Sequence, residues 1–103
     1  MKMIAAMVQD EDADELLGAL MEEGFRATRV SASGAFLRRS NAMILIGVEE
    51  GKVERALGII KTHCHTRTVR VNPLEAPYLS EPVEVEIGGA VVFIWDIERY
   101  ERF

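Results

Sequence analysis

Three adjacent residues, His63, Cys64 and His65, carry the strongest metal-ligand and nucleophile chemistry in this 103-residue sequence. The chain has no other cysteine or histidine, so these residue types cannot complete a tetrahedral metal site. A cysteine nucleophile needs a base placed across a cleft, whereas both histidines are its immediate neighbours in the sequence. The pattern favours a half-buried cysteine between two solvated histidines at a helix end, and we expect no metal site.

Other residue types that perform catalysis lack the context they need. Ser31, Ser33 and Ser40 are not part of a G-x-S-x-G motif, and the glycines form neither a G-x-G-x-x-G motif nor a P-loop. Glu84 and Glu86 share one face of a predicted strand, where solvated carboxylates are commoner than an acid–base pair. The sequence therefore predicts a binding protein that is not an enzyme.

A nucleotide site is the chemistry that remains. Residues 24–48 contain no Asp or Glu, although four arginines fall there: Arg26, Arg29, Arg38 and Arg39. Arginine suits phosphate because its planar guanidinium donates two parallel hydrogen bonds, and Thr28 adds a hydroxyl donor beside Arg26. Phe36 can stack on a purine and Asn41 can read the edge of the base. Each residue also has a structural explanation (a core plug, an exposed strand face, a turn), and the residues alone leave both interpretations open.

The whole chain is acidic, with 12 Lys+Arg against 17 Asp+Glu and a net charge of -5. This balance argues against binding to a nucleic-acid polymer, which depends on neutralising phosphates. The length fits a single domain over residues 1–103, and no apolar stretch approaches a membrane span or a signal-peptide core. Because one cysteine suits a reducing compartment, we expect a cytoplasmic protein without membrane insertion.

Hydrophobic periodicity predicts an α+β domain with the order strand-helix-strand, strand-helix-strand, and then an added C-terminal β-hairpin. The expected strands are 1–9, 25–31, 42–48, 66–71, 82–87 and 90–97, with a short extended piece at 36–38 and the longest loop at 72–80. One helix begins near Asp10 and stops at Gly24, the second spans 51–64, and Gly88-Gly89 is the expected hairpin turn. This is the ferredoxin-like split pattern, in which two helices cover one face of an antiparallel sheet. The other face has no cover, and its apolar residues predict self-association.

The chain resembles the PII-like cyclic di-AMP receptors of Gram-positive and related bacteria nearly end to end. The resemblance rests on the order and spacing of several segments: Met1-Lys2-Met3-Ile4 with Val8-Gln9-Asp10, Gly24-Phe25-Arg26-Ala27-Thr28, Gly34-Ala35-Phe36-Leu37-Arg38 with Asn41, Gly47-Val48, and the segment from Pro82 to Ala90 with Val92-Phe93. It implies a cytosolic homotrimer without a cofactor that takes part in signal transduction. Cyclic di-AMP would bind in clefts between subunits, and the ordering of loops would be read by an unknown downstream protein.

The resemblance also implies which residues bind the ligand. The counterpart of Arg26 binds phosphate, Thr28 contacts the nucleotide, and Phe36 and Leu37 line an adenine pocket. Asn41 makes a polar contact, and Gly47 permits close approach of the backbone. The full set of expected ligand-binding residues is Arg26, Ala27, Thr28, Ala35, Phe36, Leu37, Asn41 and Gly47.

Three alternatives use the same fold class. A PII-like trimer can bind another adenine nucleotide, ATP or ADP, in place of cyclic di-AMP. A CutA-type trimer would bind a metal through His63, Cys64 or His65. An enzyme such as an acylphosphatase would use Arg26 and Asn41, but the Gly-rich phosphate loop near the N-terminus is absent from the sequence.

Overall fold

The computed structural model describes residues 1–31, 42–74, 78 and 80–103. Over these residues the chain forms two α-helices, one 3₁₀ turn and six strands. The two helices and six strands were predicted from the sequence, whereas the 3₁₀ turn before the second helix was not. The elements in order are β1 (Lys2–Val8), α1 (Asp10–Glu22), β2 (Arg26–Val30), β3 (Ala42–Val48), η2 (Glu50–Lys52), α2 (Val53–His63), β4 (Thr66–Val71), β5 (Val83–Gly88) and β6 (Ala90–Asp96). The predicted extended piece at 36–38 lies outside the described residues, as do parts of the predicted loop at 72–80.

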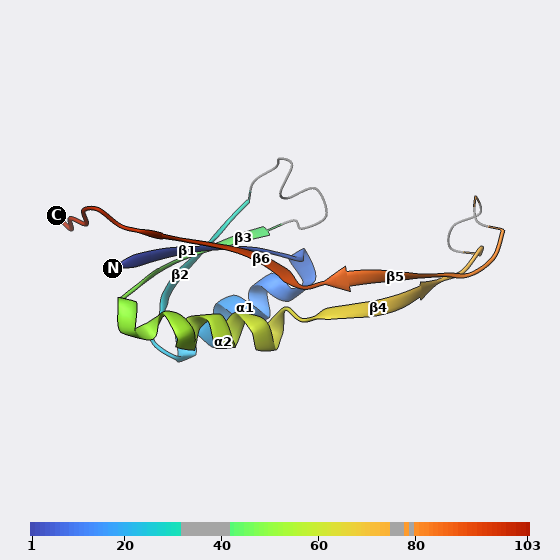
Figure 1. Ribbon diagram of the computed structural model, residues 1–103, viewed down its shortest axis with the longest axis horizontal. Helices are drawn as coiled ribbons and strands as arrows, with labels where there is room; N and C mark the ends of the chain where they lie inside the picture. Colours follow the sequence, from blue (N-terminus) through green and yellow to red (C-terminus); the bar gives the residue numbers. More distant parts are fainter. Residues whose placement is uncertain (32–41, 75–77, 79) are drawn as a thin grey trace.

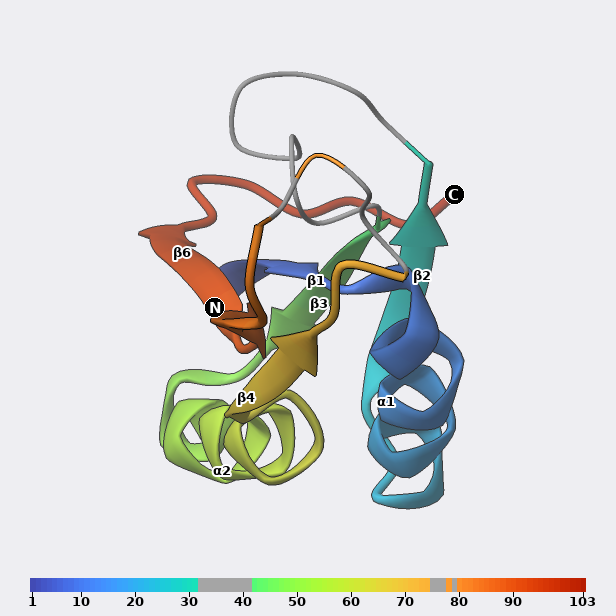
Figure 2. The ribbon, with the colours of Figure 1, turned by 90° about the vertical axis from the view of Figure 1, so that its right-hand side faces the viewer.

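Four strands form an antiparallel sheet in the order β2-β3-β1-β6, and both helices lie on one side of it (Figure 2). Along β3, buried and partly buried residues alternate strictly, so one face of the strand points into the core. The core contains Ile4 and Val8 of β1, Ile44 and Ile46 of β3, Leu16 and Leu20 of α1, and Ala56, Ile59 and Ile60 of α2. This arrangement confirms the predicted α+β architecture with two helices over an antiparallel sheet.

The end of α1 determines where β2 begins. Gly24 has a φ of 85°, and its N–H donates to the carbonyl of Met21 at 3.0 Å. The N–H of Phe25 donates to the carbonyl of Leu20, also at 3.0 Å, which completes a Schellman motif. Phe25 is buried in the core, so Arg26 emerges from the helix end as the first residue of the strand.

The predicted hairpin between residues 82–87 and 90–97 is wrong. β5 pairs instead with β4, from Val71 opposite Val83 to Thr66 opposite Gly88, and β6 pairs with β1 at the edge of the main sheet. Gly88 and Gly89 both have positive φ, but they bend the chain from one sheet into the other and do not reverse it. The physical reason is the open edge of β1, which the apolar strand β6 occupies. β4 and β5 therefore leave the body as a two-stranded ribbon, called the arm from here on (Figure 1).

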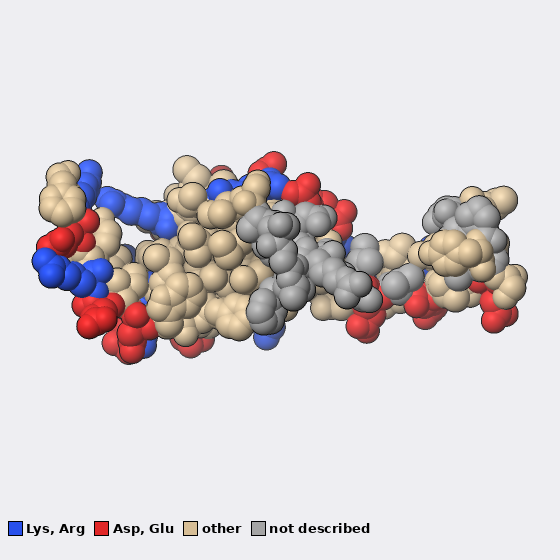
Figure 3. Space-filling view, turned by 90° about the horizontal axis from the view of Figure 1, so that it is seen from above, with Lys and Arg blue, Asp and Glu red and all other residues tan. Residues whose placement is uncertain are grey.

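No helix among the described residues covers the sheet face opposite α1 and α2. The side chains of β6 on this face are Val91, Phe93 and Trp95, which are 47%, 40% and 48% exposed. Figure 3 views the molecule from this side and shows a mostly uncharged surface over the body. Over the part of the chain that the structure describes, the exposed apolar face that the sequence predicted is thus present.

Candidate functional site

A cleft of about 610 Å³ lies at the end of the main sheet where β2 begins, and its size is within the usual range for small-molecule sites. Its lining comes from several parts of the chain that are distant in sequence. The N-terminal residues and β1 contribute Met1 and Met3, the turn after α1 contributes Glu23 to Phe25, β2 contributes Arg26 and Thr28, β3 contributes Leu45, Gly47 and Val48, and Glu49, Lys52 and Tyr100 complete it.

The strand register brings Arg26 and Thr28 together on the open face of the sheet. Arg26 lies opposite Gly47 and Thr28 lies opposite Leu45 on β3. Gly47 has no side chain, and among the described residues a Cβ there would meet only the methyl carbon of Met1 within 4 Å, at 3.7 Å. The cleft therefore has a guanidinium, a hydroxyl and an unobstructed stretch of backbone at its centre.

Among the described residues Arg26 has no carboxylate partner, in contrast to four of the six other arginines in that part of the chain. Arg29, Arg55, Arg67 and Arg99 each form an ion pair with an aspartate or glutamate. Two acidic residues do line the cleft, but Glu23 pairs with Arg55 and Glu49 is exposed. The side chain of Arg26 is consequently available to an anion that enters the cleft.

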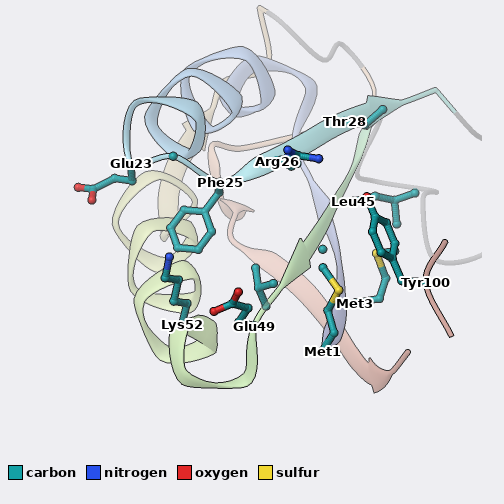
Figure 4. A pocket seen from close by; sticks show the side chains of 13 residues that line it. Met1, Met3, Glu23, Phe25, Arg26, Thr28, Leu45, Glu49, Lys52 and Tyr100 are labelled. Atoms are coloured by element: carbon teal, nitrogen blue, oxygen red, sulfur yellow. The ribbon is translucent and has the colours of Figure 1, made fainter. Parts of the chain in front are cut away.

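Apolar side chains lie on both sides of Arg26. Figure 4 shows Phe25 near Lys52 on one side, and Tyr100 beside Leu45 and Met3 on the other. A cationic centre between flat apolar walls matches a molecule that carries phosphate next to aromatic bases. A purine nucleotide has this chemistry.

Sequence reasoning missed Tyr100 and Lys52 as site residues. Tyr100 reaches the cleft because the N–H of Ile97 donates to the carbonyl of Met1 at 3.0 Å, which aligns the C-terminal tail with the start of β1. No local pattern encodes that contact between the two ends of the chain. The only sequence feature that could have suggested Tyr100 is that it is an aromatic residue within a charged C-terminal tail.

The predicted ligand-binding residues fall into three groups. Arg26, Thr28 and Gly47 line one cleft. Ala27 lies on the opposite face of β2, partly buried against the core, and does not line the cleft. The remaining four lie outside the described residues: Ala35, Phe36, Leu37 and Asn41.

The described part of the chain does not arrange His63, Cys64 and His65 as a metal site. Cys64 is buried, and burial together with the nearby Asp12 carboxylate raises its pKa to about 11. The Nδ1 atom of His63 lies 3.2 Å from an oxygen of Glu15, and His65 is exposed. Over the residues that the structure describes, no group of three or more His, Cys, Asp or Glu side chains converges on one point.

Two comparisons with known proteins show what the whole chain is similar to. The model of the cyclic-di-AMP receptor family matches residues 1–103, the whole chain. The chain therefore belongs to the cyclic-di-AMP receptor family, which confirms the resemblance seen in the sequence. A crystal structure of a functionally unknown protein from Pediococcus pentosaceus is similar, with 37% identity and a TM-score of 0.78, over 99% of this chain and 96% of that one. Within the described residues, no helix is both long and apolar enough to cross a membrane.

Proposed function

We propose that this protein is a non-catalytic cytosolic receptor that binds cyclic di-AMP in the cleft around Arg26. Membership of the cyclic-di-AMP receptor family supports a signalling role through this ligand. The observation that carries the proposal is the guanidinium of Arg26, which has no carboxylate partner among the described residues and lies beside Thr28 and Gly47. An arginine in such a cleft is suited to a phosphodiester.

The chemistry of the ligand matches the layout of the cleft. Arg26 donates hydrogen bonds to a phosphate oxygen, and the Thr28 hydroxyl donates to the same group. Tyr100 and Phe25 offer flat surfaces for adenine on either side of this centre. From the family resemblance we also assign Phe36 and Leu37 to an adenine pocket, Asn41 to a polar contact with the ligand, and Gly47 to close approach of the backbone. Ala27 and Ala35 complete the proposed ligand-binding residues.

The uncovered sheet face supports the second part of the proposal, a homotrimer. Val91, Phe93 and Trp95 form an apolar surface that a single chain exposes to water, and self-association would bury it. In such a trimer each cleft lies next to a neighbouring subunit. Ligand binding then orders loops at the cleft, and a downstream protein recognises the ordered state.

Substitution of Arg26 by Gln tests the site. It removes a charge-assisted hydrogen bond to phosphate, so the dissociation constant for cyclic di-AMP rises about tenfold to a hundredfold in isothermal titration. Arg70→Gln is the matched control, because Arg70 is an exposed strand arginine outside the cleft. Both variants keep the oligomeric state of the wild type. Equal affinity of the Arg26→Gln variant and the wild type would remove Arg26 from the site.

A further inference from the structure

Two arginines from different strands hold the acidic first turns of α1. Arg29 of β2 bonds Asp14 at 2.7 Å through Nη1 and also bonds Asp10 through Nη2. Arg67 of β4 bonds Glu11 at 2.7 Å and Asp12 at 3.3 Å, both through Nη2. The start of α1 is therefore attached on one side to the strand of the cleft, and on the other side to the arm.

The arm has few other attachments to the body. β4 and β5 pair with each other and with no further strand over the described residues. Among the ion pairs of the same residues, only those of Arg67 join the arm to another element. The orientation of the arm thus depends on its root, where β4 begins and β5 ends.

Two glycines make this root tight. Gly88 has a φ of 83°, and a Cβ there would lie 2.7 Å from the carbonyl oxygen of His65. Gly89 has a φ of 80°, and a Cβ there would lie 2.8 Å from the hydroxyl oxygen of Thr66. The two chain segments that connect the arm to the body therefore lie against each other at the root. A displacement of Arg67 would consequently change the position of both segments.

Asp12 makes the Arg67 contact energetically important. The residue is 8% exposed, and its Oδ2 atom is buried without a hydrogen-bond partner among the described residues. A buried carboxylate is costly without a cation, so Asp12 depends on Arg67 for compensation. The hydrogen bond to Glu11 and the charge of Asp12 also raise the pKa of Arg67 above its usual value.

We propose that Arg67 is a latch that fixes the arm on α1, and that α1 couples the arm to the nucleotide cleft. Arg29 is next to Thr28 in β2 but lies on the opposite face of the sheet, toward α1. A phosphate that binds Arg26 and Thr28 in the cleft shifts β2, Arg29 transmits the shift to α1, and Arg67 transmits it to the arm. The latch follows from the contacts alone, whereas the coupling rests on the proposed function.

Amide hydrogen exchange of the ligand-free protein tests the latch. Arg67→Met removes the charge and keeps the length of the side chain. Arg70→Met makes the same change three residues along β4, at an exposed position on the opposite face of the strand. Exchange in residues 66–71 and 83–88 rises about fivefold to tenfold in Arg67→Met, because a partly exposed charge-assisted contact is lost. Arg70→Met exchanges like the wild type. An unchanged arm in Arg67→Met, or the same increase in both variants, would overturn the latch.

The same measurement with saturating cyclic di-AMP tests the coupling. In the wild type and in Arg70→Met, ligand changes the exchange of the arm. In Arg67→Met the ligand binds with a dissociation constant within about threefold of the wild-type value, and the arm no longer responds. The coupling would be overturned by either of two results. One is a ligand-dependent change of arm exchange in Arg67→Met equal to that of the wild type, and the other is a wild-type arm whose exchange does not change when ligand binds. Failure of the wild type to bind cyclic di-AMP would instead overturn the proposed function, and the ligand-free comparison would still decide the latch.

Discussion

Arg26 and Arg29 lie on the same strand, yet they have different roles because they face opposite sides of the sheet. Arg26 points into the cleft, whereas Arg29 bonds Asp10 and Asp14 on α1. Both are arginines of the same acid-free stretch, and the sequence alone does not distinguish them by type. The alternation of side chains along β2 distinguishes Arg26 from Arg29. Ala27 and Arg29 face the core side of the sheet, opposite Ile46 and Ile44 of β3.

Cys64 is a residue for which the structure predicts low reactivity. Because its pKa is raised to about 11 from 9.0, mainly by burial, the thiolate fraction near pH 8 is lowered about a hundredfold. We expect a thiol reagent such as DTNB to label the native protein about a hundred times more slowly than the protein in denaturant. Equal rates in the two conditions would contradict the buried, protonated thiol.

The same shift gives the stability of the protein a dependence on alkaline pH. The thiol stays protonated in the folded state at pH values where the unfolded chain has already lost the proton. Its contribution to the free energy of unfolding is therefore complete below about pH 9 and is lost as the pH rises toward 11. Urea denaturation at several pH values measures this loss, and Cys64→Ala removes the part that Cys64 causes.

At the scale of elements, the sequence predicted most helices and strands but not all of their partners. The hydrophobic pattern of residues 42–48 and the stop at Gly24 are local signals, and both elements appear where expected. Gly88-Gly89 was misleading because two glycines with positive φ suit a hairpin turn and a bend equally well. The choice between them depends on the free edge of β1, which is a tertiary feature. For the same reason Tyr100, which reaches the cleft through a contact between chain ends, could not be predicted.

Substitution of Gly88 by Ala tests the tight root of the arm. The new Cβ would meet the His65 carbonyl at a backbone conformation that disfavours alanine, so the free energy of unfolding falls by about 1–3 kcal/mol. Gly18→Ala is the control, because Gly18 lies within α1 and a Cβ there meets nothing within 4 Å. We expect this control to be as stable as the wild type or more stable by about 0.5–1 kcal/mol. Urea denaturation compares them, and a stable Gly88→Ala variant would contradict the close contact.

At the scale of the whole molecule, the apolar sheet face predicts self-association. Trp95→Glu places a charge on this face at a position that is already half exposed in one chain, so the fold survives and the oligomer dissociates. Met21→Glu, on the exposed side of α1, is the control and keeps the wild-type assembly. Light scattering after size exclusion gives the mass: three times the 11.5 kDa chain for the wild type and the control, and a lower mass for Trp95→Glu. A monomeric wild type would contradict the homotrimer.

Isothermal calorimetry tests directly whether this protein binds cyclic di-AMP, as the cleft around Arg26 leads us to expect. The wild-type protein is titrated with cyclic di-AMP by isothermal calorimetry, and the titration is repeated with ATP and with cyclic di-GMP. We expect saturable binding of cyclic di-AMP at one ligand per chain, with much weaker binding of ATP and cyclic di-GMP. The absence of heat with cyclic di-AMP at several temperatures, or tighter binding of ATP, would contradict this expectation.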